Sequence, residues 1–282
     1  MLVHVLNGLV HGGMLYIMSV GLVMIFGLRR VVNFAHGALY MLGAYVGYTA
    51  AMAFGFWVAL PAAALVLAAL GVILDRTVFR TLQKEDPIVT VLVTFGILLV
   101  LEDVVRTIWG KDLISFPMPD LLSGSIAIGE ITFPVYRLAV IGAAILVAGG
   151  LSAWLRLTRA GLYVRASSVD PVTTAMQGVD TERLSMLVVA VGTGLAGLSG
   201  VIAAPLIALS PSMGASILIE SFIVVVTGGL GSFAGAFVAA LVIGQLHNLG
   251  VVYTPNVASM IPLVLMVAVL IWRPNGIVRS AH

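Results

Sequence analysis

The run ILIESFIVVVTGGLGSFAGAFVAALVIGQL at residues 217–246 is longer than one membrane crossing requires, and TGGLGS interrupts it at residues 227–232. A spanning helix takes about 20 mostly apolar residues. Glycines in the middle of such a run favour a break between two helices. Because broken helices at membrane depth are tolerated only against protein or a watery cavity, this stretch predicts a discontinuous membrane segment inside a helical bundle.

The composition of the 282-residue chain agrees with that prediction, since 61% of the residues are hydrophobic and only 9% are charged. A soluble domain carries about 25% charged residues, and the mean hydropathy of this chain is +1.15. The sequence lacks the alternating segments of about 10 residues that are typical of a membrane barrel. We therefore predict one all-α domain, residues 1–282, built as a polytopic transmembrane helical bundle with about eight membrane segments.

The remaining apolar runs predict where those segments lie. No Lys or Arg precedes the first run, unlike in a secretory signal peptide, so we expect residues 1–28 to remain as a spanning helix. Residues 108–135 form the longest non-helical candidate, with short-strand character from Ser125 to Phe133. The expected membrane segments lie at residues 5–28, 38–54, 56–74, 88–107, 136–155, 184–209, 217–246 and 258–272.

The basic residues are distributed unevenly between the two ends of these segments. The arginine pair after the first segment, the 75–87 loop, residues 156–183 and the C-terminal tail hold eleven of the fourteen Lys and Arg residues. Short loops rich in Lys and Arg face the cytoplasm, so we expect the C-terminus inside and the N-terminus and the 108–135 loop outside. This parity requires the 217–246 run to enter and leave the membrane on the same side.

A short internal similarity is consistent with two related halves. Transporters built from related halves often carry paired, glycine-interrupted segments, but two glycine-rich helices can also match by chance, and both interpretations stay open. The residues that align at one constant offset are Gly37, Gly43, Ala44, Tyr45 and Val46 with Gly229, Gly235, Ala236, Phe237 and Val238.

Two polar residues in an apolar context, Asn33 and His36, follow the first arginine pair. Polar side chains inside a bilayer are costly without a partner, so both are candidates for lining a solute pathway. The alternative is structural: Asn33 caps the second helix, and His36 bonds a neighbouring helix.

The glycine break supplies the other candidate pathway residues, Thr227, Gly228, Gly229 and Ser232. If Ser232 caps a new half-helix, the free N–H groups and the positive dipole end of that helix lie at mid-depth and suit a carboxylate. The alternative is that a stripe of small residues beginning at Gly231 lets helices pack closely.

Residues 156–183 carry helix-start and helix-stop signals inside a polar segment. Asp170 followed by Pro171 is typical of an N-cap and a first helical position, and Gly178 suits the C-terminal stop. A helix of about two turns is marginal alone, so it needs a partner surface; the alternative is an ordinary interfacial loop. The apolar face of this short helix consists of Val172, Ala175 and Met176.

Four motifs, in order, resemble those of LivH-type permeases, the membrane subunits of branched-chain amino acid ABC importers. The first is FGLRRVVNFAHGALYMLGAY at residues 26–45, and the second is RAGLYVRASSVD at residues 159–170, followed by Gly178. The third is FIVVVTGGLGS at residues 222–232, and the fourth is RPNG at residues 273–276. Thr227 departs from the family pattern, in which an aliphatic residue is more usual before the two glycines.

The resemblance implies a permease subunit of an ATP-binding-cassette importer in a bacterial inner membrane. The implied solutes are branched-chain or other small amino acids, or related small organic acids and amides. The implied partners are a LivM-like second permease, two LivG/LivF-like ATPase subunits, and a periplasmic or extracellular substrate-binding protein. The solute pathway would lie between the two permeases, flanked by Asn33, His36 and the glycine break. Residues 161–178 would couple to an ATPase, with matching positions at Gly161, Arg165, Ala166, Asp170, Ala175 and Gly178.

Other activities are not expected of this chain. Lys84 and Lys111 lack the G-x-x-x-x-G-K-[ST] context of a phosphate-binding loop, so ATP and Mg are expected on partner subunits and no cofactor on this chain. The sequence has no cysteine and no hydrolase or metalloprotease signature, and its scattered net charge of +2 does not favour nucleic-acid binding. We expect no metal site and no catalytic residue. The alternative function is an ATP-independent channel or facilitator for a small polar solute.

Overall fold

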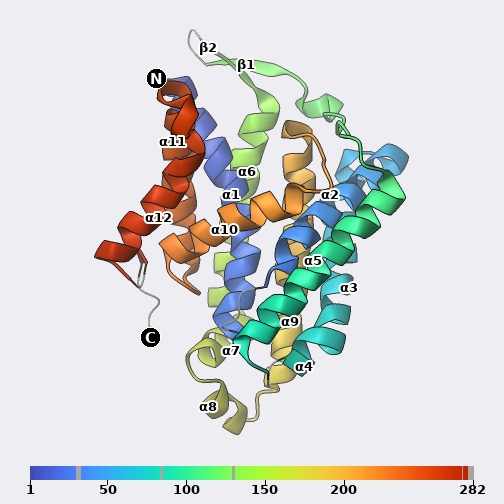
Figure 1. Ribbon diagram of the computed structural model, residues 1–282, viewed down its shortest axis with the longest axis vertical. Helices are drawn as coiled ribbons and strands as arrows, with labels where there is room; N and C mark the ends of the chain where they lie inside the picture. Colours follow the sequence, from blue (N-terminus) through green and yellow to red (C-terminus); the bar gives the residue numbers. More distant parts are fainter. Residues whose placement is uncertain (30–32, 83–84, 129–130, 275, 279–282) are drawn as a thin grey trace.

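Long helices dominate the computed structural model, which describes residues 1–29, 33–82, 85–128, 131–274 and 276–278 (Figure 1). The apolar runs form α-helices because all backbone groups then pair within the same segment. The α-helices are α1 (Leu2–Arg29), α2 (Ala35–Phe54), α3 (Phe56–Leu74), α4 (Arg80–Leu82), α5 (Pro87–Trp109), α6 (Val135–Leu157), α7 (Arg159–Val169), α8 (Pro171–Met176), α9 (Thr181–Ala203), α10 (Met213–Gly228), α11 (Phe233–Tyr253) and α12 (Ile261–Trp272). The shorter elements are the π-helical turn η1 (Asp75–Phe79), the 3₁₀ turns η2 (Asp120–Leu122), η3 (Ala204–Leu206) and η4 (Pro255–Met260), and the strands β1 (Ser125–Ile128) and β2 (Ile131–Pro134).

Eight helical stretches among the described residues are long and apolar enough to cross a membrane. This confirms the predicted polytopic bundle with about eight membrane segments. The stretches are Leu2–Arg29, Ala35–Phe54, Phe56–Leu82, Pro87–Trp109, Val135–Leu157, Thr181–Leu206, Phe233–Tyr253 and Pro255–Trp272.

The third stretch continues past the predicted end at residue 74, through η1 and α4 to Leu82. The charged Asp75 indicated an end, but its side chain is buried and forms an ion pair with Arg29 at the end of α1. Because the partner arginine neutralises the carboxylate, the helix continues where the sequence indicated a loop.

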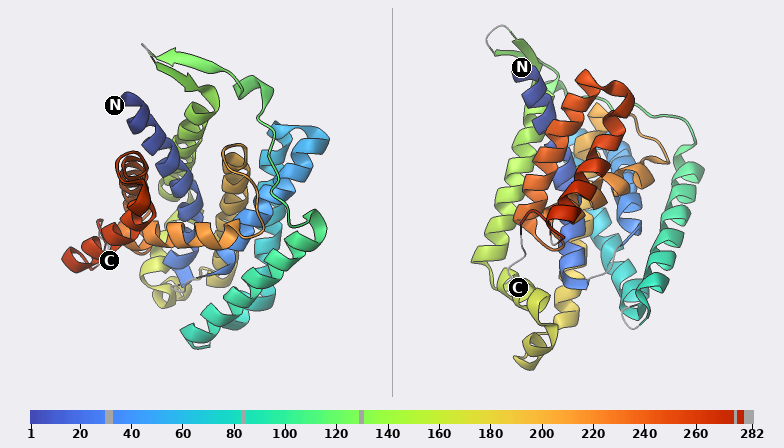
Figure 2. Two further views of the ribbon diagram at one scale, coloured as in Figure 1. Left: turned by 45° about the horizontal axis from the view of Figure 1, so that its top comes forward. Right: turned by 60° about the vertical axis from the view of Figure 1, so that its left-hand side comes forward.

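The loops gather at two opposite ends of the bundle (Figure 1). The N-terminus and the β1–β2 hairpin lie at one end, and α4, α7 and α8 lie at the other (Figure 2). This grouping matches the predicted separation of the 108–135 loop from the basic segments. The predicted strand character of residues 125–133 is also confirmed, since β1 and β2 pair antiparallel with Ile126 opposite Phe133. Arg30, Lys84 and Arg279, which contributed to the charge count, lie outside the described residues.

The centre of the bundle is packed through small residues. Helix α1 contacts α6, α9, α10 and α11, and α9 also contacts α2 and α3. Gly21 of α1 lies against Gly192 of α9, and Gly43 of α2 lies against Gly197, so closely that an added Cβ would collide with backbone atoms. Helices α3, α5 and α12 lie at the outside and expose apolar side chains, as a lipid-facing surface requires.

The two segments of the aligned repeat occupy different places in the fold. Gly37 lies in the first turn of α2, whereas Gly229 lies in the break before α11. The same offset places the start of α2 opposite Thr227, which is inside α10. The alignment of the two sequence segments therefore does not align the start of α2 with the start of α11.

Candidate functional site

The predicted break in the 217–246 run lies between α10, which ends at Gly228, and α11, which begins at Phe233. Gly229 and Gly231 have positive φ angles of 105° and 81°, a conformation that side chains other than glycine disfavour. The Ser232 hydroxyl accepts a hydrogen bond from the Gly235 N–H at 3.1 Å, which confirms the predicted cap of a new helix.

Helix α10 does not cross the bundle. It lies across the middle, and α11 runs back to the end that holds the N-terminus (Figures 1 and 2). With 16 residues, α10 is also shorter than the eight spanning stretches. The predicted entry and return on one side are therefore confirmed, and the break lies inside the bundle.

The C-terminal tail covers one side of the break. The Ile277 N–H donates to the Thr227 carbonyl at 2.9 Å, and the Val278 N–H donates to the Gly228 carbonyl at 3.3 Å. The last carbonyls of a helix otherwise lack intrahelical partners, so the tail completes the end of α10. Thr227 and Gly228 are buried beneath it.

The two polar candidates near the start of α2 have structural contacts. The Asn33 side-chain oxygen accepts from the Ala35 N–H at 3.0 Å, and His36 Nε2 lies 3.2 Å from the Met18 carbonyl of α1. The structural alternative for His36 is therefore confirmed. Asn33 binds the N–H of the first helical residue, but the N-cap position itself is occupied by Phe34, one residue later than predicted. Met18 lies near the midpoint of α1 (Leu2–Arg29), so α2 also begins at mid-depth. The Nδ2 atom of Asn33 and the Nδ1 atom of His36 are buried without a hydrogen-bond partner among the described residues, and a role in a solute pathway stays a prediction.

The predicted short helix in the 156–183 segment is α8. The Asp170 carboxylate accepts from the N–H groups of Val172 and Thr173 at 3.0 and 3.1 Å, and Pro171 is the first helical residue. The hydrogen bond from the Thr173 side chain, with those from the backbone, lowers the pKa of the Asp170 carboxyl. Gly178 follows with a φ of 82°. The predicted cap and stop are confirmed.

Helix α7 joins α8 to the bundle and begins at a cap that the sequence analysis missed. The Thr158 hydroxyl accepts from the Gly161 N–H at 3.0 Å. Gly161 is buried against the end of α6, where an added Cβ would meet the backbone of Leu155 and the carbonyl of Trp154. Thr is a preferred N-cap residue, so Thr158 was a usable signal for this helix start.

The apolar face of α8 is uncovered. The side chains of Val172 and Met176 are 63% and 78% exposed, and Ala175 is exposed between them. Figure 1 shows α8 at the far end of the molecule, beyond the spanning helices. The helix therefore presents a formed apolar face that no other part of the described chain covers.

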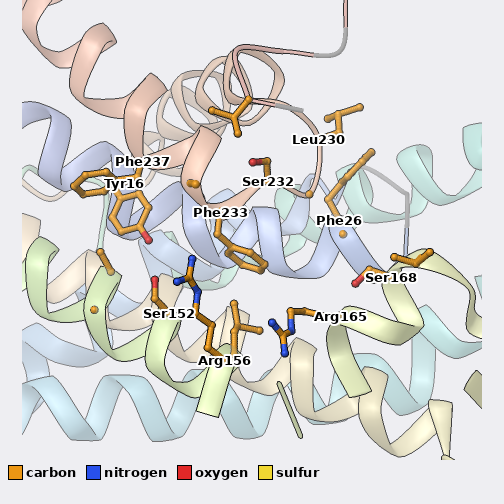
Figure 3. A pocket seen from close by; sticks show the side chains of 18 of the residues that line it. Tyr16, Phe26, Ser152, Arg156, Arg165, Ser168, Leu230, Ser232, Phe233 and Phe237 are labelled. Carbon is orange, nitrogen blue, oxygen red and sulfur yellow. The ribbon is translucent and has the colours of Figure 1, made fainter. Parts of the chain in front are cut away.

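A cavity of about 1470 Å³ brings residues from both predicted sets together. It lies between α1, α6, α7 and the glycine break, and Figure 3 shows its labelled side chains. Arg165 and Ala166 of the predicted coupling set line it together with Ser232 of the predicted pathway set. The predicted coupling residues therefore fall into two groups: Arg165 and Ala166 line this cavity, whereas Asp170, the N-cap of α8, and Ala175 within α8 do not.

The ion pair between Arg29 and Asp75, which joins the ends of α1 and α3, was not predicted from the sequence. Arg29 Nη1 also donates to the Phe79 carbonyl at 2.9 Å. The two residues are 46 positions apart in the sequence, so no rule based on local spacing could have predicted the pair. A buried pair without one partner is strongly destabilising, which makes this contact a structural constraint at the basic end of the bundle.

These features define a polytopic membrane protein with a re-entrant half-helix and a capped break, and discontinuous helices of this kind are common in transporters. The break does not lie at the predicted mid-depth, because Gly231 lies against Gly27, near the end of α1. Residues 4–270 match the family described as the permease component of the branched-chain amino acid transport system. The chain therefore belongs to this family, and its role is transport rather than catalysis.

Known permeases resemble the chain over nearly its whole length. It is 25% identical over 288 residues to the high-affinity branched-chain amino acid transport permease BraD of Pseudomonas aeruginosa, covering 96% of this chain and 93% of that protein. The same identity and coverage hold for LivH of Escherichia coli K12. The probable permease LivH of Methanocaldococcus jannaschii is 26% identical over 290 residues, covering 96% of this chain and 90% of that protein. No solved structure matches the chain.

Proposed function

We propose that this chain is the permease subunit of an ATP-binding-cassette importer that carries branched-chain or other small amino acids, or related small organic acids and amides. The observation that carries the ATP-driven part of the proposal is α8, a capped helix with an uncovered apolar face at the end of the bundle. A facilitator that worked alone would have no use for such a face. The names of the relatives support the class of solute.

The orientation of the chain follows from its basic residues. The described arginines near α4, α7 and α8 lie at the end opposite the N-terminus and the hairpin. Because basic loops face the cytoplasm, we place α8 in the cytoplasm of a bacterial inner membrane and the N-terminus outside. The C-terminus lies on the cytoplasmic side in this proposal.

The partners follow from what the chain lacks and what it exposes. Two ATPase subunits, resembling LivG and LivF, would bind ATP and Mg and receive the apolar face of α8. A second, LivM-like permease would complete the pathway, and a substrate-binding protein would deliver solute from outside. On this chain the pathway would pass near the glycine break and the mid-depth start of α2, where Asn33 and His36 lie.

The experiment purifies the tagged chain in a mild detergent from cells that also produce the proposed partner subunits, and identifies the proteins bound to it by mass spectrometry. The complex is then placed in liposomes with labelled leucine, the binding protein and ATP. We expect a second permease, two ATPases and uptake only with ATP. Recovery of the chain alone, with solute uptake in ATP-free liposomes, would establish the facilitator instead.

A further inference from the structure

We propose that the cavity beside the glycine break binds one anionic phospholipid, whose phosphate lies between Arg156 and Arg165. This inference depends on the insertion of the chain in a membrane and not on its being part of an importer. It assigns a ligand to a cavity that residues of both predicted sets line but for which neither the coupling role nor the solute pathway names an occupant.

The two arginines come from different helices and reach the same cavity. Arg156 lies in the last turn of α6, and Arg165 lies in α7, which turns back beneath it. Figure 3 shows both guanidinium groups on one wall, with Phe233 between them and Ser232. No carboxylate of the described chain lies within 4 Å of either group, in contrast to Arg29, Arg80, Arg106 and Arg183.

Most of the remaining cavity wall is apolar and suits acyl chains, although Tyr16, Ser152, Ser168 and Ser232 also line it. Ile145 and Ala148 of α6 and Phe233 and Phe237 of α11 line it. Ile145 is 60% exposed and Leu162 is 54% exposed, so apolar side chains continue from the cavity to the outer surface. A free phosphate ion would contact only the arginine end, whereas a phospholipid would cover both the charged and the apolar wall.

The spacing along α6 fits one leaflet. From Ile145 to Arg156 the helix rises about 16 Å, and half of a hydrocarbon core of about 30 Å is about 15 Å. A headgroup at Arg156 therefore places the acyl chains beside Ile145. Basic pockets between membrane helices at the cytoplasmic side are suited to anionic headgroups.

The occupied cavity would also affect the break, since Leu230, Gly231 and Ser232 line it. A lipid that contacts both α7 and the break ties α7 to the start of α11. We therefore expect lipid binding to raise the thermal stability of the chain as well as to be detectable directly.

The test measures competition for a spin-labelled phosphatidylglycerol bound to the full chain in neutral detergent, with phosphatidylglycerol and phosphatidylcholine as competitors. The wild-type chain should prefer phosphatidylglycerol. Arg156→Gln and Arg165→Gln should each weaken that binding about fivefold. Arg159→Gln is the matched control, because it removes the same charge from the same segment but does not line the cavity, and it should bind as the wild type does.

A second variant keeps the test decisive if an arginine variant does not fold. Ala148→Trp retains both charges but fills the cavity, so it should also displace the phosphatidylglycerol. Equal affinity for the two lipids, or an equal loss in Arg159→Gln, would overturn the proposal. Displacement of the bound lipid by millimolar inorganic phosphate alone would show a phosphate-ion site and would also overturn it.

Discussion

Helices α8 and α11 both begin at a side-chain N-cap, but α8 is exposed at one end of the molecule whereas the start of α11 is packed inside the bundle. Asp170 caps α8 and Ser232 caps α11, each through hydrogen bonds to N–H groups of the first turn. The start of α11 lies inside the bundle beside α10, whose last carbonyls are completed by the C-terminal tail. The apolar face of α8 has no cover. The comparison shows that this chain covers the glycine break itself and leaves the apolar face of α8 exposed. In the proposed importer, an ATPase subunit would cover that face.

The largest expected effect is at the break, where α10 and α11 touch through glycines. A Cβ at Gly235 would collide with the carbonyl of Gly228, and both groups belong to helix backbones that cannot move apart separately. Gly235→Leu should therefore destabilise the fold by at least about 3 kcal/mol, the upper end for overpacking. The yield of monodisperse protein and its melting temperature in detergent measure this loss.

The matched control for that substitution is Gly142→Leu in α6, because nothing lies within 4 Å of an added Cβ there. It should leave the yield and the melting temperature nearly unchanged. Equal losses at the two positions would mean that the contact between α10 and α11 is not a special constraint.

The next effect concerns the uncovered face of α8. Met176→Asp replaces an exposed apolar side chain by a charge, so the chain itself should fold normally. If an ATPase buries this face, the substitution should weaken ATPase recovery about 30-fold, from the roughly 2 kcal/mol that burial of a Met side chain contributes. Gln177→Asp, which adds the same charge next to the face, should leave recovery nearly intact. Full recovery with Met176→Asp would remove α8 from the interface.

A smaller effect is expected from the cap of α8. Asp170→Ala removes the acceptor for two N–H groups, so amide hydrogen exchange across residues 172–177 should become about fivefold faster. Asp170→Asn retains a capping oxygen and should exchange at nearly the wild-type rate. If the two variants exchange alike, the negative charge matters more than the hydrogen bonds.

The smallest effect is the pH dependence of the same cap. The folded pKa of the Asp170 carboxyl is lowered by its hydrogen bonds to Thr173 and Val172. Its stabilising contribution is therefore fully present above the unfolded value of about 3.9 and is lost as the pH falls through the lower folded pKa. Carboxyl NMR of ¹³C-aspartate-labelled protein, assigned with Asp170→Asn, should give a midpoint below the ordinary value. A midpoint at or above it would contradict the cap.

Local features of the fold could be predicted from the sequence. The eight apolar stretches, the break at the glycines, the hairpin and the caps at Asp170 and Ser232 depend on residues close together in the chain. The structural roles of Asn33 and His36 were also among the alternatives. Apart from His36, each of these follows from the period of apolar residues or from a polar side chain next to the backbone groups that it satisfies. The contact of His36 is with Met18 on another helix, 18 residues away in the sequence.

Contacts between distant residues could not be predicted. Asp75 indicated the end of a helix, since nothing in its surroundings pointed to Arg29 as a buried partner. The tail amides that complete α10 come from Ile277 and Val278, which carry no signal for that contact. The cavity that joins Arg165 to Ser232 depends on how α7 turns back at Gly161, so the predicted coupling set could not be divided in advance.

The measurement that tests the account most directly is site-specific cross-linking of the assembled complex in membranes. The chain has no cysteine, so Met176→Cys on α8 and Ile126→Cys on β1 each introduce a single reactive thiol at opposite ends of the bundle. We expect Met176→Cys to cross-link to an ATPase subunit and Ile126→Cys to link to none. An ATPase cross-link at Ile126→Cys with none at Met176→Cys would contradict both the orientation and the coupling role of α8.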